Sequence, residues 1–200
     1  AGTQLLASAV NRFSEIVVAG NLAFVTDQTN AGLTYLWVTD GSPGGTFRLS
    51  TSFVKKPSYE VMDDILYFAV EGPDTGPNSD ATIWTSNGTD AGTSVIKTVP
   101  NKFARGFAAM DGDLFYFTLE SLPSGFLETL HRLDLPSQQV TDIAAINTTQ
   151  GDLISTTVFN GQLFFELSSS SYGFELFVSD GSMGDLHVLK DINPGPNGSL

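Results

Sequence analysis

A strand, turn and strand pattern recurs along this chain at a nearly fixed interval. It appears as YLWVTDGSPGGT at residues 35–46, as TIWTSNGTDAGT at residues 82–93 and as ELFVSDGSMGDL at residues 175–186. The Gly-Thr pairs that close the first copies, and the Ala-Gly-Thr at the start of the chain, set the phase. Because a period of about 20 to 50 residues is typical of solenoids, propellers and arrays, this repeat limits the fold more than any other feature.

A second landmark follows the same period. Each unit contains a turn followed by an apolar, mostly aromatic run, in AGNLAF, DDILYF, DGDLFYF and NGQLFF. We align the leucines of these runs as Leu22, Leu66, Leu114 and Leu163. The third unit keeps this landmark although its Asp-Gly motif has decayed. We therefore expect four repeats of about 46 residues each.

Four short runs in each repeat predict strands, because they are rich in β-branched and aromatic residues and are separated by turn residues. In the last repeat they are LISTTVF, QLFFEL, FELFVS and LHVLKDI. Asn-Gly, Asp-Gly or Ala-Gly between the first two strands favours a tight hairpin. Consecutive apolar residues such as Leu163, Phe164 and Phe165 need cover on both faces of the sheet. The sequence therefore predicts an all-β chain made of four-stranded antiparallel blades, as in a β-propeller.

The repeat also predicts where the blades begin and end. We expect a trailing strand of a preceding repeat at residues 1–10, blade 1 at 11–56, blade 2 at 57–104, blade 3 with its degenerate motif at 105–150, and blade 4 with a linker at 151–200. An unpaired apolar strand would be an aggregation-prone edge, so the leading strand is expected to pair outside residues 11–200. The chain is then part of a longer propeller or array, with a closed four-bladed ring as the alternative.

The repeated Asp-Gly predicts an architectural turn rather than a reactive site. Asp and Asn side chains accept hydrogen bonds from backbone N–H groups just downstream, and glycine adopts the left-handed dihedrals that such turns need. The second copy has asparagine in place of aspartate, which a capping acceptor tolerates and a charge-dependent ligand does not. The predicted turn residues are Asp40, Gly41, Thr46, Asn87, Gly88, Thr93, Asp180 and Gly181.

A bulky planar side chain precedes each turn, at Trp37, Trp84, His131 and Phe177. We interpret this aromatic slot as a packing position buried between blades. His131 fits the series, and the chain has only one other histidine, so we expect a buried, hydrogen-bonded imidazole rather than a metal ligand.

The three motif copies resemble the ELWxxDGT repeat, a motif of large secreted or surface-exposed bacterial proteins whose units are predicted to form propeller blades. The last copy also has the KDINPG ending of that repeat, at residues 190–195. The third unit departs from the pattern, with TLHRLDLPSQQV in place of the Asp-Gly and Gly-Thr. The family has no general activity, so the resemblance implies an extracellular or cell-surface location and an architecture.

Composition narrows the partners and the chemistry. Twenty-two acidic residues against nine basic ones give a formal net charge of −13, which disfavours nucleic acid. The absence of cysteine excludes disulfides and thiolate sites. We found no membrane-spanning apolar run, phosphate-binding loop or nucleophile motif, and we expect no cofactor.

Two weaker signals remain in the sequence. Acidic pairs at Asp63 with Asp64, Asp111 with Asp113, and Asp74 with Asp80 allow weak calcium binding, although none forms a calcium loop. Glycosylation sequons begin at Asn87, Asn147 and Asn197.

Taken together, these patterns favour a non-enzymatic structural, adhesive or protein-interaction module. Its expected partners are another protein or further repeats of the same polypeptide. The second interpretation is a lectin-like propeller that binds glycan, and a weaker third one is a polysaccharide-active enzyme, which would need a clustered pair of carboxylates.

Overall fold

The computed structural model describes residues 12–28, 34–53, 58–71, 80–100, 102–148 and 153–195. All regular secondary structure within these ranges is β-strand, in agreement with the predicted class. The strand predicted at residues 1–10 lies outside the described residues. Within the described part of the chain no helix is present that could cross a membrane.

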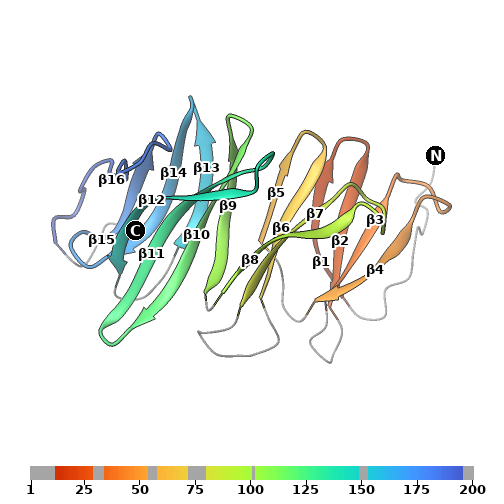
Figure 1. The fold of residues 1–200 in the computed structure, drawn as a ribbon, viewed down its shortest axis with the longest axis horizontal. Coiled ribbons are helices and arrows are strands. Elements are labelled where there is room, and N and C mark those ends of the chain that lie inside the picture. The colour runs from red at the N-terminus through yellow and green to blue at the C-terminus, as the bar shows by residue number, and fades with distance from the viewer. Residues whose placement is uncertain are drawn as a thin grey trace. The chain divides into compact units, whose positions relative to one another are not determined.

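Sixteen strands form four antiparallel sheets, each with its strands in chain order (Figure 1). Blade 1 contains β1 (Arg12–Ala19), β2 (Leu22–Gln28), β3 (Thr34–Thr39) and β4 (Phe47–Phe53). Blade 2 contains β5 (Ser58–Met62), β6 (Ile65–Glu71), β7 (Ala81–Ser86) and β8 (Thr93–Val99). Blade 3 contains β9 (Phe103–Met110), β10 (Asp113–Leu122), β11 (Gly125–Asp134) and β12 (Gln139–Thr148). Blade 4 contains β13 (Leu153–Phe159), β14 (Gln162–Ser169), β15 (Gly173–Ser179) and β16 (His187–Val188).

The blades are grouped in two compact units. The first unit holds blade 1 and nearly all of blade 2, and the second unit holds blades 3 and 4. Ala81, the first residue of β7, and Val99, the last residue of β8, are grouped with the second unit. Within each unit the two blades touch through their first strands, β1 with β5 and β9 with β13. Each unit is therefore a pair of sheets packed face to face.

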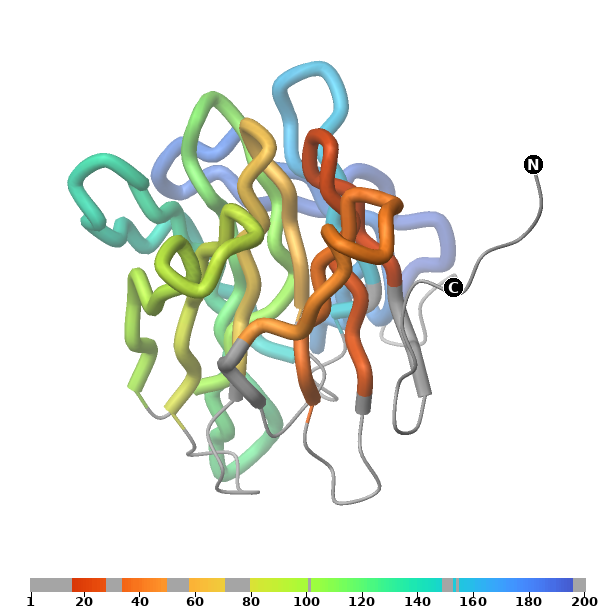
Figure 2. The backbone as a smooth tube through the Cα atoms, turned by 90° about the vertical axis from the view of Figure 1, so that its right-hand side faces the viewer, coloured from red at the N-terminus to blue at the C-terminus, as the bar shows by residue number. Residues whose placement is uncertain are grey.

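Tight turns join the first two strands of each blade. Both residues have positive φ in Asp63-Asp64, in Asp111-Gly112 and in Asn160-Gly161, which is the signature of a type I′ hairpin. In blade 1 the turn is Gly20-Asn21, with φ of 58° at Gly20. Figure 2 shows that the two hairpins of each unit point the same way.

Strand register corrects the alignment of the second landmark. The aromatic slot residue lies directly across from Val25 in blade 1 and from Phe165 in blade 4. Counting back from these partners, the equivalent of Leu163 is Ala23, not Leu22. The predicted Ala-Gly hairpin was wrong for the same reason, because β1 continues through Ala19 and the turn begins one residue later.

Two further predictions about strand ends need correction. Strand β9 begins at Phe103, two residues before the expected start of blade 3. The last run, LHVLKDI, was expected to form a full strand, but β16 contains only His187 and Val188. One further backbone hydrogen bond joins this segment to β15, from Leu189 N to Leu176 O at 2.8 Å.

Each blade has two faces, which we name for use below. The slot face carries Trp37, Trp84, His131 or Phe177, and the opposite face, on which the next blade of the unit packs, is the seat face. In the first unit Phe68 and Trp84 on the slot face of blade 2 pack on Phe24, Leu36 and Val38 on the seat face of blade 1.

The second unit repeats this arrangement. Its core joins Leu163, Phe165 and Phe177 on the slot face of blade 4 to Phe115 and Phe117 on the seat face of blade 3. The rings of Phe117 and Phe165 meet edge to face with centroids 4.9 Å apart. Each core is thus an interface between two blades, as consecutive apolar residues along the strands predict.

The glycine of the Asp-Gly turn is part of these interfaces. Gly41, Gly88 and Gly181 have φ of 88°, 86° and 79°, so all three use the left-handed conformation. A Cβ at Gly181 would lie 2.8 Å from both Met110 Cε and Phe115 Cζ of blade 3, whereas a Cβ at Gly41 would meet nothing within 4 Å. The same turn is therefore packed on a neighbouring blade in blade 4 and open in blade 1.

We predict that Gly41→Ala lowers the free energy of unfolding by about 1–2 kcal/mol, because a side chain in the left-handed region costs about that much. Gly181→Ala should cost a further ~1–3 kcal/mol, since its methyl group overlaps Phe115. Urea denaturation of the full chain measures both. The matched control is Gly161→Ala, which has φ of 70° and open space around it. Equal losses at Gly161 and Gly181 would show that the contact with blade 3 contributes nothing.

Candidate functional site

The repeated Asp-Gly turn closes through its own side chains. In blade 1, Asp40 Oδ1 accepts hydrogen bonds from Ser42 N at 2.8 Å and from Ser42 Oγ at 2.7 Å. The hydroxyl of Thr39 accepts from Gly41 N at 3.0 Å, and Thr46 Oγ1 donates to Ser42 O at 2.6 Å. These bonds occupy one carboxylate oxygen and fix both ends of the loop.

Blade 2 forms the same network with a neutral acceptor. Asn87 Oδ1 accepts from Thr89 N at 3.1 Å and from Thr89 Oγ1 at 2.8 Å. Gly88 N donates to Ser86 Oγ at 3.2 Å, and Thr93 Oγ1 donates to Thr89 O at 2.6 Å. The exchange of aspartate for asparagine leaves the geometry intact, as expected of an oxygen that serves only as an acceptor.

Blade 4 closes its turn with a second carboxylate. Asp180 Oδ1 accepts from Ser182 N at 2.8 Å, and Asp185 Oδ2 accepts from Asp180 N at 2.7 Å. Asp185 occupies the position of Gly45 and Gly92 in the other copies, so a side-chain carboxylate helps to close this loop, which lacks the Gly-Thr pair. Gly184 N donates to Ile143 O of blade 3 at 2.7 Å and ties the turn to the neighbouring blade.

Blade 3 lacks the motif but rebuilds the turn. Asp134 Oδ1 accepts from Ser137 N at 2.8 Å and from Ser137 Oγ at 2.5 Å. Gln138 has a positive φ of 57°, but it lies four residues after Asp134, whereas the glycine of the motif directly follows its Asp or Asn. The sequence analysis did not identify Asp134 as a turn residue. An aspartate followed three residues later by serine, between two predicted strands, would have indicated a side-chain-capped turn.

The turn hydrogen bonds stabilise the charged carboxylates. The hydrogen bond from the Ser42 hydroxyl, followed by that from its backbone N–H, lowers the pKa of Asp40. The Ser182 side chain and backbone lower the pKa of Asp180, and those of Ser137 lower the pKa of Asp134. A lowered pKa suits a capping acceptor and is opposite to the raised pKa of a general acid.

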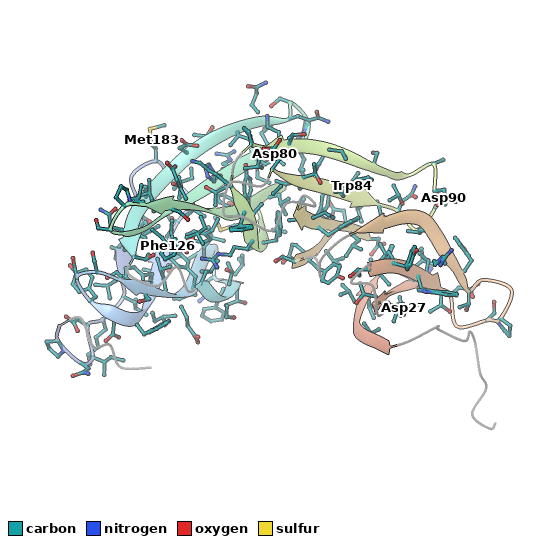
Figure 3. All side chains as sticks on the ribbon, turned by 90° about the horizontal axis from the view of Figure 1, so that it is seen from below. Asp27, Asp80, Trp84, Asp90, Phe126 and Met183 are labelled. Carbon is teal, nitrogen blue, oxygen red and sulfur yellow. The ribbon has the colours of Figure 1, made fainter. Side chains whose placement is uncertain are left out.

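The aromatic slot is less uniform than expected. Phe177 and His131 are buried, but Trp37 and Trp84 are only half-buried, so full burial was wrong for the two indoles. Trp84 lies on β7 (Figure 3), where it stacks on Phe68 with centroids 6.1 Å apart and donates from Nε1 to Thr82 Oγ1 at 2.8 Å.

His131 is part of a hydrogen-bonded relay that the sequence did not reveal. Thr118 Oγ1 lies 2.7 Å from His131 Nε2, and His131 Nδ1 lies 2.7 Å from Asp142 Oδ1. These residues come from β10, β11 and β12, which the sheet places side by side. A neutral imidazole fits, donating from Nδ1 to the carboxylate and accepting from the hydroxyl at Nε2.

This relay has the residue types of a catalytic triad, but a substrate cannot reach its hydroxyl group. Thr118 is 1% exposed, and Tyr116 stacks on the imidazole with centroids 5.0 Å apart. Burial lowers the pKa of His131 despite the opposing effect of Asp142. The hydroxyl is therefore closed off from a substrate, and the expected buried, hydrogen-bonded histidine is what the structure shows.

A cavity of about 190 Å³ opens within the second unit, beside the Asp-Gly turn of blade 4. The Arg132 side chain forms an ion pair with Asp113, whose carboxylate is largely buried. The lining residues are Met110, Asp111, Asp113, Phe115, Arg132, Asp180, Gly181 and Ser182. The hairpin turn of blade 3 and the Asp-Gly turn of blade 4 both contribute to this lining.

The structure shows the positions of several residues that the sequence suggested for calcium binding or glycosylation. Asp63 and Asp64 form a hairpin turn, and Asp113 is paired with Arg132. Among the residues that the structure describes, no three His, Asp or Glu side chains are grouped to hold a metal ion. Asn147 is exposed near the end of β12, while Asp74 and Asn197 lie outside the described ranges.

Comparison with solved structures identifies the architecture. The propeller domain of the Trilobed protease from Pyrococcus furiosus, described as having an open velcro topology, matches with a TM-score of 0.53 and 9% identity over 88% of this chain and 70% of that one. The uncharacterized protein lmo1340 from Listeria monocytogenes EGD-e matches with a TM-score of 0.56 and 11% identity over 90% of this chain and 55% of that one.

An exo-β-1,3-galactanase from Phanerochaete chrysosporium matches with a TM-score of 0.52 and 12% identity, over 94% of this chain and 51% of that one. This chain spans 38% of a puromycin hydrolase and of the Pyrococcus horikoshii acylaminoacyl peptidase, to which it is also similar. No family model and no curated protein matches in sequence. At these identities the comparisons establish the fold alone: the four sheets are propeller blades.

We predict that Asp40→Asn leaves the thermal midpoint nearly unchanged and that Asp40→Ala lowers it, because only the second removes the acceptor for Ser42. Ser42→Ala should raise the pKa of Asp40 toward the ordinary aspartate value, measured from the carboxyl ¹³C shift. The folded pKa is depressed, so the stabilisation is complete above the unfolded pKa and is lost as pH falls through the folded one. An activity or metal affinity lost in Asp40→Asn would contradict the architectural interpretation.

The slot residues should differ in their contribution to stability according to burial. We expect Phe177→Ala to lower the free energy of unfolding by about 3–5 kcal/mol, the usual range for a buried aromatic residue. Trp84→Ala should cost less, because one edge of its ring is solvated, and Trp37→Ala least. Chemical denaturation of the three variants gives the order. A loss at Trp37 as large as that at Phe177 would show that burial does not determine the cost.

Proposed function

We propose that this chain is a propeller module of a secreted or cell-surface bacterial protein of the ELWxxDGT type, and that it acts through protein contact, as a structural or adhesive element, without catalysis. The observation that carries the proposal is the closure of the repeated turns. In blades 1 and 2 the same side chains make the same hydrogen bonds with either aspartate or asparagine as acceptor. The repeat is thus built for architecture.

Membership of the ELWxxDGT type is supported by the roles of the motif residues. The Trp or Phe at the slot packs on or near a blade interface, the Asp or Asn caps the turn, and the glycine supplies the positive φ. Each motif position has a structural reason to recur. Location at the cell surface or outside the cell follows from that resemblance and suits the acidity of the chain.

The absence of accessible nucleophilic chemistry at the relay supports a non-catalytic role. Thr118 is buried, and the hydrogen bond from Nδ1 of His131 goes to a largely exposed carboxylate, that of Asp142. An active nucleophile needs a hydroxyl within reach of the substrate. A polysaccharide-active enzyme is the weaker alternative.

A lectin-like function is the second candidate, and the cavity beside Arg132 favours it. The acidic residues Asp111 and Asp180 and the basic residue Arg132 line it together. Sugar hydroxyls both donate and accept hydrogen bonds, so a mixed acidic and basic lining can orient a sugar unit.

A glycan array combined with a hydrolysis screen over soluble polysaccharides separates these candidates. We predict that the full chain gives no saturable glycan signal and releases no sugar. If glycan binding appears, Arg132→Gln and the matched control Lys102→Gln locate it: both remove an ion-paired cation from blade 3, and only Arg132 lines the cavity. Binding abolished by Arg132→Gln alone would replace the proposed function with a lectin.

A further inference from the structure

Asn-Gly pairs are places where a protein chain can react with itself. The backbone nitrogen of the second residue can displace the side-chain amide of the first, and glycine has no Cβ to hinder that approach. The sequence has three such pairs, at residues 87–88, 160–161 and 197–198, and the structure describes the first two. One lies in the repeated turn of blade 2 and the other in the hairpin turn of blade 4. The same chemistry can therefore be compared in two settings.

The pair in blade 2 is held at both reacting groups. Gly88 N, the nucleophile, belongs to a buried residue and donates to Ser86 Oγ at 3.2 Å. Asn87 Oδ1 accepts from both N and Oγ1 of Thr89. Gly92 lies against the same amide, since a Cβ on Gly92 would be 2.3 Å from Asn87 Cγ. The nitrogen and the amide carbon can meet only after this cap has been broken.

The pair in blade 4 has no such restraint. Asn160 and Gly161 are exposed and have φ of 51° and 70°, as in a type I′ turn. The pairing of such a hairpin joins Phe159 to Gln162 and does not use the N–H of Gly161. A Cβ at Gly161 would meet nothing within 4 Å. Among the described residues no hydrogen bond fixes the Asn160 amide, so its side chain can rotate toward the nitrogen.

The exposure of this hairpin turn does not depend on whether a further blade covers blade 4. Blade 3 has the same turn at Asp111-Gly112, with φ of 55° and 84°. Both of these residues are exposed although blade 4 is packed on the seat face of blade 3. A neighbouring blade thus covers the strands and leaves the hairpin turn in solvent.

We propose that Asn160 is a site of spontaneous modification, at which the chain converts this asparagine into aspartate and isoaspartate, while the cap of the repeated turn protects Asn87. Gly161 N forms a bond to Asn160 Cγ, the bond from Cγ to the amide nitrogen breaks, and ammonia leaves with the proton that Gly161 N gives up. Water then opens the succinimide at either carbonyl, so the main chain continues through the α-carbonyl or through the side chain. The inference goes beyond the proposed function and holds whether or not the blades bind glycan.

The two products should differ in their effect on the hairpin. Aspartate already has a positive φ at the equivalent positions of blades 2 and 3, Asp63 and Asp111, so aspartate at position 160 fits the turn. Isoaspartate adds one main-chain carbon to a two-residue turn, and turn length fixes the pairing of Phe159 with Gln162. Modification by the second route therefore loosens this end of the hairpin.

Ageing of the full chain at mildly alkaline pH, followed by chymotryptic peptide mapping with mass spectrometry, tests the proposal. We expect the folded chain to modify Asn160 about tenfold faster than Asn87 or more, because reaction at Asn87 must first break the hydrogen bonds of its cap. In concentrated urea the two rates should converge, since both asparagines precede glycine.

Two variants assign the effect to these residues. Thr89→Val keeps the shape of an exposed side chain but removes a donor to Asn87 Oδ1, so it should speed the reaction at Asn87 and leave that at Asn160 unchanged. Asn160→Gln should abolish the mass change in its own peptide, because the longer side chain must close a larger ring. Equal rates at Asn160 and Asn87 in the folded chain, an Asn160 that reacts only in urea, or a rate at Asn87 insensitive to Thr89→Val would each overturn the proposal.

Discussion

Face-to-face packing of neighbouring blades is the constraint on which the rest of this structure depends. A four-stranded sheet with apolar side chains on both faces cannot be covered by its own strands, so each blade needs a neighbour. The cores around Phe24 with Phe68 and around Phe117 with Phe165 are formed in this way. The hairpins, the positive φ glycines and the turn hydrogen bonds all hold the strands in the register that presents those faces.

Turn chemistry and face packing meet at one residue. The glycine after the capping aspartate provides the dihedral for the loop and the space for the neighbouring blade, as Gly181 does against Phe115. A side chain there would disturb both at once. The dihedral requires glycine at all three copies, and the space requires it at Gly88 and Gly181, whereas the preceding residue changes between aspartate and asparagine.

The sequence predicted the all-β class and the four-stranded antiparallel blades, because hydrophobic pattern and turn residues are local properties. It aligned Leu22 rather than Ala23 with Leu163, an error of one residue. Both Gly20-Asn21 and Ala19-Gly20 are acceptable turn sequences, and only the strand register distinguishes them. The burial of Trp37 was overestimated because exposure depends on which face has a neighbour. The Thr118–His131–Asp142 relay was invisible, as its members are brought together by strand pairing across three strands.

The hydrogen bond from Gly184 N to Ile143 O has a consequence for how the second unit unfolds. A bond between blades can break only when the blades separate or the loop opens, so the two sheets share part of their stability. Repeat proteins of this kind are described by the intrinsic stability of each repeat plus a term for each nearest-neighbour interface. Here the interface term includes a backbone bond as well as the phenylalanine contacts, which couples the folding of blade 4 to that of blade 3 and makes the pair, rather than the single blade, the cooperative element of the unit.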